Sequence, residues 1–233
     1  MKDEFDRKKL QSTFDIAITD ANLFQEALTH RSYLNEHRGY PYSHNERLEF
    51  LGDAVLELVV TRYLFDHFSE KPEGELTSFR AALVNGDMLG KIGCDLGVQE
   101  FLLMSRGEAK DTGRARSYLI ANAMEAIIGA IYLDQGYEAA GHFIEQHVLS
   151  HLDEVIAEGL HTDPKSRFQE LAQEKTSITP GYRILKEWGP DHDRHFIAGV
   201  FLGEELVAEG EGISKQDAQR EAAKNALGKK GWQ

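Results

Sequence analysis

The spacing of apolar residues changes along the chain, and this change constrains the fold most strongly. From about Asp20 to about Ala157, apolar residues recur every three or four positions, as in helices with one buried face. From Gly181 onward, short stretches rich in β-branched and aromatic residues alternate with polar ones, which is typical of strands. The helices of the first part are expected at Asn22–Ser32, His44–Phe68, Leu76–Leu96, Ser117–Gln135 and Tyr137–Ala157. We therefore expect an all-α domain followed by a smaller α+β domain.

The boundary between the two domains is expected at residues 158–162, a short linker where glycine and a following proline interrupt the helical pattern. The first domain then covers residues 1–157 and the second residues 163–231. Asp163 can cap the first helix of the second domain. We see no internal repeat in either part.

The second domain is expected to follow an α-β-β-β-α order. After its first helix come three strand-like stretches, and then Ser214 can cap a last helix that Gly228 would end. The strands are expected at Gly181–Glu187, His195–Phe201 and Glu205–Gly210.

The net charge of −13 by itself disfavours a nucleic-acid partner. However, residues 163–233 hold 11 Lys and Arg against 12 Asp and Glu, so almost all the acidic excess lies in the first domain. A polyanion would be repelled from that domain unless bound cations offset part of its charge.

The compartment is expected to be the cytoplasm. A single cysteine, Cys94, excludes a disulfide framework. The N-terminal stretch is charged and has no apolar core, so it does not resemble a signal peptide. No apolar run approaches the roughly 20 residues that span a bilayer, so no membrane association is expected.

The stretch Asn45–Leu56 carries the densest chemical signal. On a helix, Glu46, Glu49 and Asp53 fall within roughly 60° of one another. Like charges at these spacings destabilise a helix, and a bound cation would remove that cost. A solvated acidic face remains the alternative. Ser43 is expected to cap this helix, with Glu46 in the capping-box position.

A second helical stretch, Ile120–Ala130, places Asn122 and Glu125 on one face among small and apolar residues. A partly buried carboxylate needs a partner, which is either a metal ion or the guanidinium of an arginine. Oxygen ligands without nearby His or Cys suit Mg²⁺, for which Mn²⁺ can substitute. A water held by such an ion can act as the nucleophile for phosphodiester hydrolysis. Gly52, in the middle of the first acidic helix, suggests close approach of another helix or chain.

These two stretches resemble the ribonuclease III family. NERLEFLGDAVL at residues 45–56 is similar to its signature, and EAIIGAIYLD at 125–134 is similar to its second acidic block. The resemblance extends over nearly the whole chain, because the α-β-β-β-α segment is similar to a double-stranded RNA-binding domain. It implies a Mg²⁺-dependent endonuclease that cleaves double-stranded RNA, including ribosomal and messenger precursors, without a small-molecule cofactor. The implied products have 5′-phosphate ends and short 3′ overhangs.

The resemblance also implies roles for individual residues. Asp53 and Glu125 would be catalytic, and the metal ligands would be Glu49, Asp53, Asn122 and Glu125. Glu46 and Glu73 would be accessory acidic residues. Phe50 would insert into the partner subunit of a homodimer, which would place two active sites across one duplex.

Asn122 departs from the family pattern, which has Asp at this position. Asn keeps an oxygen that can bind Mg²⁺ but removes one negative charge. A natural variant, an engineered change and a degenerate site all remain open. The rival function is therefore a non-cleaving regulator that binds double-stranded RNA. A helical interaction protein with solvated acidic faces is a third alternative.

The second domain is expected to bind duplex RNA through three regions, because such RNA is recognised mainly by shape through its 2′-hydroxyls and phosphates. They are one face of the first helix, the loop before the second strand, and the start of the last helix. The candidate residues are Ser166, Gln169, Glu170, Gln173, His192, Ser214 and Lys215. The last helix is less basic at its start than is common in such domains, which predicts a shallow salt dependence.

Overall fold

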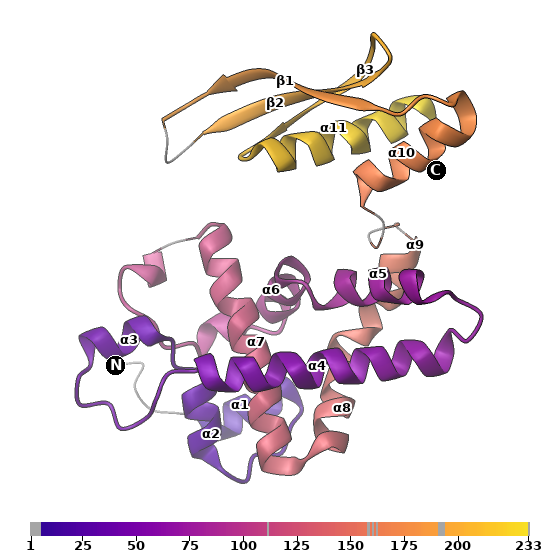
Figure 1. Cartoon of the computed structure of the whole chain (residues 1–233). Coiled ribbons are helices and arrows are strands. Elements are labelled where there is room, and N and C mark those ends of the chain that lie inside the picture. Colours follow the sequence, from indigo (N-terminus) through magenta and orange to yellow (C-terminus); the bar gives the residue numbers. More distant parts are fainter. Residues whose placement is uncertain are drawn as a thin grey trace. The chain divides into compact units, whose positions relative to one another are not determined.

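A computed structural model describes residues 6–110, 112–157, 159, 161, 163–190 and 194–232. The chain divides into two compact units, Met1–His161 and Thr162–Gln233 (Figure 1). The first is helical and the second has the order α-β-β-β-α, so the predicted fold class is confirmed. None of the described helices combines the length and apolarity needed to cross a membrane.

The N-terminal unit is built around two long helices, α4 (Glu46–His67) and α7 (Arg114–Gln135). Each contributes apolar residues to one continuous core, including Leu56 and Val60 from α4 and Ile127 and Ile131 from α7. The surrounding helices are α1 (Arg7–Phe14), α2 (Ala21–Ala27), α3 (Arg31–Glu36), α5 (Glu73–Val84), α6 (Gly86–Asp95), α8 (Tyr137–His147) and α9 (Leu152–Ala157). Short 3₁₀ turns are η1 (Val98–Glu100), η2 (Glu108–Lys110) and η3 (Leu149–His151).

Three of the helices expected from the sequence are each divided in two. The segment predicted as Leu76–Leu96 breaks at Asn85, whose backbone is extended and whose side chain accepts a hydrogen bond from the amide of Met88 at 2.9 Å. The segment Asn22–Ser32 breaks before His30, which caps α3 in the same way. Tyr137–Ala157 is interrupted after His147 by the turn η3. At Asn85 and His30, a side-chain cap therefore overrides an apolar pattern that runs through the break.

The start of α4 also differs from expectation. Ser43 does not cap it, because the residue before the first helical turn is Asn45, and no side chain caps the helix there. The amide of Asn45 instead donates to the carbonyl of Thr29 at 2.9 Å, which fixes the start of α4 against a neighbouring segment. Thr29 and Asn45 are both buried, so this backbone contact lies inside the unit.

The C-terminal unit is a three-stranded antiparallel sheet in the order β1-β2-β3, with both helices on one side of it (Figure 1). The elements are α10 (Pro164–Thr176), β1 (Gly181–Trp188), β2 (His195–Leu202), β3 (Glu205–Gly212) and α11 (Lys215–Lys230). Asp163 caps α10 as predicted, because its carboxylate accepts from the amides of Lys165 and Ser166. The expected stop at Gly228 is wrong: α11 continues to Lys230 and ends at Gly231, which has a φ of +63°.

Candidate active site

Two glycines allow α4 and α7 to cross with their backbones in contact. A Cβ placed on Gly52 would lie 1.7 Å from the carbonyl oxygen of Glu125, and one on Gly129 would lie 2.3 Å from that of Leu48. Neither position has room for any other residue without moving a helix. The sequence predicted a close approach at Gly52, whereas Gly129, its counterpart on α7, was missed although it too lies in mid-helix.

The crossing joins the two acidic stretches into one cluster, which we call the crossing site (Glu49, Asp53, Asn122 and Glu125). Burial, together with the negative charges of Asp53 and Glu49, raises the pKa of Glu125 to about 8. The carboxylates therefore interact across the two helices. At neutral pH and without a cation, Glu125 holds its proton.

Glu49 belongs to the same electrostatic group. Burial is the largest cause of its raised pKa, and the charges of Glu46 and Asp53 add to it. A hydrogen bond with the Asn122 side chain acts in the opposite direction and lowers the pKa of Glu49. Asn122, the residue at which the sequence departs from the family pattern, therefore interacts directly with Glu49.

The chemistry of the crossing site fits Mg²⁺. Its donors are three carboxylates and one amide oxygen, which are the hard ligands this ion prefers. The causes of the raised pKa of Glu125 include no cationic side chain, so the alternative of a salt bridge to arginine is not found among the described residues. In that same part of the chain, no three His, Cys, Asp or Glu side chains form a ready metal cage. Mg²⁺ does not require one, since it retains several waters and takes few carboxylates.

Glu46 lies beside the crossing site and has polar neighbours of its own, the guanidinium of Arg31 and the ring of His44. Its carboxylate oxygens lie 3.7 Å from a guanidinium nitrogen of Arg31 and 3.7 Å from Nδ1 of His44. Neither of these two neighbours of Glu46 was predicted from the sequence. Arg31 follows directly after a helix break that the apolar pattern did not predict, so its proximity to Glu46 could not be foreseen.

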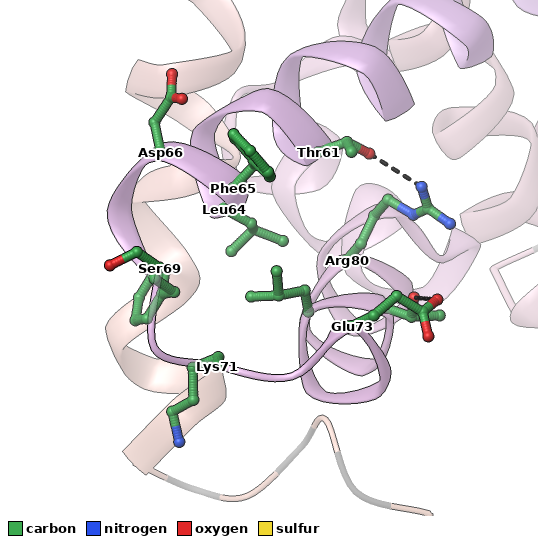
Figure 2. Close-up of a pocket in the computed structure, with 11 residues that line it drawn as sticks. Thr61, Leu64, Phe65, Asp66, Ser69, Lys71, Glu73 and Arg80 are labelled. Carbon is green, nitrogen blue, oxygen red and sulfur yellow. Dashed lines mark hydrogen bonds between the residues drawn. The ribbon is translucent and has the colours of Figure 1, made fainter.

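Glu73 lies apart from the crossing site, at the first turn of α5. Its carboxylate accepts a hydrogen bond from the hydroxyl of Thr77 at 3.1 Å. It lines a pocket of about 720 Å³ between the end of α4 and α5, where the guanidinium of Arg80 donates to the hydroxyl of Thr61 at 2.9 Å (Figure 2). Thr61 is about 12 Å along α4 from Asp53, given the rise of a helix.

Phe50 projects from α4 into solvent, with 80% of its surface exposed. Leu58 and Phe65 are also exposed, and helical geometry places all three within about 80° of one another. They form an apolar stripe beside the acidic one. Phe65 also lines the pocket that contains Glu73 (Figure 2).

The RNA-binding candidates that the structure describes in the C-terminal unit lie on α10 and at the start of α11. All four candidates on α10 are exposed: Ser166, Gln169, Glu170 and Gln173. Lys215 is exposed at the start of α11, with its ammonium 5.7 Å from the ring centre of Phe196. His192 lies outside the described residues.

The first turn of α11 carries an acidic residue, Asp217, as well as the basic Lys215. The hydroxyl of Ser214 donates to the carboxylate of Asp217 at 2.7 Å and accepts from its amide at 3.0 Å. The cap predicted at Ser214 is confirmed. The negative charge of Asp217 stabilises the helix dipole but opposes phosphate binding at this helix end.

The chain is similar to known families in both units. Residues 20–152 match the family model described as Ribonuclease-III-like. Residues 164–229 match that of the double-stranded RNA binding motif. The first match lies within the N-terminal unit and the second within the C-terminal unit.

Whole-length relatives and a solved structure agree with these models. Ribonuclease 3 of Enterococcus faecalis is 44% identical over 94% of this chain and 95% of its own length. Ribonuclease 3 of Desulforamulus reducens is 41% identical over 97% of this chain and 92% of its own. The nuclease domain of ribonuclease III from Campylobacter jejuni is 40% identical with a TM-score of 0.56, covering 64% of this chain and 97% of that domain. A second structure of that domain concerns flexibility in a region involved in dimer formation; its identity is 42% and its TM-score 0.53 over 60% of this chain and 96% of that one.

Proposed function

The chain belongs to the ribonuclease III family and is a metal-dependent endoribonuclease for double-stranded RNA, and on that premise we propose that the crossing site holds Mg²⁺ for the cleavage. The observation that carries this proposal is the convergence of Glu49, Asp53 and Glu125 across the α4–α7 crossing, with the pKa of Glu125 raised to about 8. A cluster of carboxylates that repel one another is stabilised by a divalent cation.

Each residue of the crossing site has a distinct part in this proposal. Asp53 and Glu125 bind the ion most directly and are the catalytic pair, while Glu49 and Asn122 complete the ligand set. When bound, Mg²⁺ supplies Lewis-acid activation of the phosphodiester and of the attacking water. Mn²⁺, which accepts the same oxygen ligands, substitutes for it. The products are duplex ends with 5′-phosphates and short 3′ overhangs.

Glu46 and Glu73 act outside the ligand set as accessory acids. Glu46 lies 3.7 Å from both Arg31 and His44, and its charge acts on Glu49. Glu73 reaches an active site only through a second copy of the chain, since within one copy it belongs to the pocket at the end of α4. We also propose a cytoplasmic location, in keeping with the single cysteine, and the processing of ribosomal and messenger RNA precursors.

Metal binding is tested by the stability of the protein, without any RNA. A ligand that binds only the folded state raises the free energy of unfolding as its concentration grows. Wild-type protein should therefore gain about 3 kcal/mol at a Mg²⁺ concentration one hundred times the dissociation constant. Glu125→Gln should gain far less. Equal gains in the two proteins would place the ion elsewhere.

The exposed stripe of α4 supports a homodimer. Leu58 lies midway between Phe50 and Phe65, so two α4 helices that run antiparallel and cross at Leu58 bring Phe50 close to the partner's Phe65. The pocket lined by Leu64, Phe65 and Leu76 would then receive the aromatic ring. Burial of the stripe removes an apolar patch that is costly to expose.

The homodimer is tested by sedimentation of a Phe50→Asp variant. Wild-type protein should have twice the mass of the 26.3 kDa chain, and the variant should shift towards the single chain. Ile178→Asp, a change at an exposed apolar residue of the C-terminal unit, is the matched control and should leave the mass unchanged. A Phe50→Asp protein that remained fully dimeric would refute this interface.

A further inference from the structure

One face of the C-terminal sheet is left uncovered by the helices of its own unit. Along β2, Phe196, Ala198 and Val200 point towards α10 and α11 and are buried. The alternate residues Ile197 and Phe201 therefore point to the opposite side. We call this side the outer face. It holds residues that neither the crossing site nor the RNA-binding helices use.

The centre of the outer face is apolar. Leu185 and Leu206 are exposed by 44% and 39%, and they come together over Gly199 with Phe201. A Cβ at Gly199 would lie 2.9 Å from Leu185, 2.8 Å from Leu206 and 3.0 Å from Phe201. The three side chains thus form a contiguous apolar patch across all three strands.

Charges flank this patch with opposite signs on its two sides. The register pairs Arg183 of β1 with Gly199 and Gly199 with Glu209 of β3, so the three form one row across the sheet. The next row joins Lys186, Ile197 and Glu211 in the same way. Each row runs from a base through a small or apolar residue to an acid.

Among the described residues, the charged side chains of these rows make only long or solvent-exposed contacts within their own unit, so they can pair with another molecule. Arg183 lies over the ring of Phe201 and 3.7 Å from Glu204, which is 91% exposed. Glu211 lies 3.5 Å from Nδ1 of His195. Pairs that are this long and exposed to water contribute little stability, so they can be exchanged for pairs with another molecule.

We propose that the outer face docks against the same face of a second copy of this chain. A twofold axis parallel to β2 places β1 over the partner's β3, so each basic end of a row faces an acidic end. An axis perpendicular to the strands would place β1 over β1 and bring like charges together. The charge pattern therefore selects both the occupant and its orientation.

The size of the face makes this contact transient. Three strands of eight residues cover about 26 Å by 15 Å, or roughly 800 Å² counted over both copies, below the ~1,200 Å² of stable interfaces. It forms when copies are concentrated, as on one RNA or within one oligomer. Because α10 and α11 lie on the other side of the sheet, their RNA-binding residues stay exposed in the pair.

Cross-linking of the full chain tests the contact. In a Cys94→Ser background, Ile197→Cys lies on the central strand, next to the proposed axis, and so meets its own copy. A short bis-maleimide should link two chains at least about fivefold more efficiently than in the matched control Glu174→Cys, an exposed position on α10. Equal yields at the two positions would overturn the proposal and leave the face an ordinary solvated surface or one for another protein.

Charge reversal tests the orientation. Arg183→Glu with Lys186→Glu should lower the Ile197→Cys yield by about fivefold or more at low salt, and so should Glu209→Lys with Glu211→Lys. An equal mixture of the two variants should restore the yield, because every facing pair is again opposite in charge. If the cross-linking yield of the mixture stayed as low as that of either variant alone, the proposed arrangement would be refuted. Each variant must retain the circular dichroism of wild type and its affinity for duplex RNA.

Discussion

Individual carboxylates determine how the crossing site behaves. Glu125 is partly buried beside two other acids, and burial is the main reason that its pKa rises to about 8. Above its raised pKa, Glu125 lowers the free energy of unfolding of the metal-free protein, because a buried carboxylate beside two other acids is costly to ionise. Below that pKa it keeps a proton, which a cation would have to displace. On the proposed function, a divalent ion bound at the crossing site would offset this cost of ionisation.

We expect Glu125→Gln to stabilise the metal-free protein at high pH. In the unfolded chain Glu125 ionises near its ordinary pKa of 4.5, whereas in the folded protein it does so near 8. Wild type therefore loses stability as the pH rises between these values. In EDTA at pH 8.5 the variant should be more stable by about 1–3 kcal/mol, and at pH 4 the difference should vanish. Urea unfolding at both values measures this; a variant less stable than wild type at pH 8.5 would contradict it.

Asn122→Asp should lower the Mg²⁺ concentration needed for cleavage. The change adds a negative charge to the ligand set and removes the amide that hydrogen bonds with Glu49. A tenfold lower half-saturating concentration corresponds to about 1.4 kcal/mol of added binding. Gln146→Glu on α8 adds the same charge at an exposed position and should change nothing. An unchanged Mg²⁺ dependence in Asn122→Asp would argue against Asn122 as a ligand.

At the scale of elements, the site exists because two helices touch. α4 and α7 carry the acidic residues separately, and the glycine pair at 52 and 129 brings the two helix backbones together. The sequence predicted both helices, since the apolar periodicity and the two motifs lie within uninterrupted helical segments. The role of the four residues of the crossing site as metal ligands stays a prediction. The sequence did not predict the breaks at His30 and Asn85, because there a side-chain cap competes with a continuous apolar pattern.

Gly129→Ala should disrupt the crossing. The added Cβ would meet the carbonyl of Leu48, so the helices must separate, at a cost of at least about 1–3 kcal/mol despite the better helix propensity of Ala. Gly141→Ala in α8 is the matched control. A Cβ there meets nothing within 4 Å, so that variant should be as stable as wild type or more stable. Thermal unfolding compares them, and a stabilised Gly129→Ala protein would show that the close approach is unimportant.

At the scale of the whole molecule, the two units divide the work. The N-terminal unit contains the acidic site, and the C-terminal unit, which matches the double-stranded RNA binding motif, carries the exposed polar residues of α10 and the start of α11 that are predicted to contact RNA. The uneven charge of the chain follows this division. The outer face of the sheet could not be predicted from the sequence, since the side to which its residues point depends on the register of three strands and on irregularities within it.

Cleavage of a long RNA duplex in the presence of Mg²⁺, by wild type and by Glu125→Gln, measures whether the crossing site is the active site. The variant should cleave at least about 10³-fold more slowly, a loss of about 4 kcal/mol in transition-state stabilisation, and bind the duplex as tightly as wild type. Glu138→Gln, a change of an exposed acid on α8, should cleave at the wild-type rate. If Glu125→Gln cleaved the duplex as fast as wild type at the same Mg²⁺ concentration, the crossing site would not be the active site.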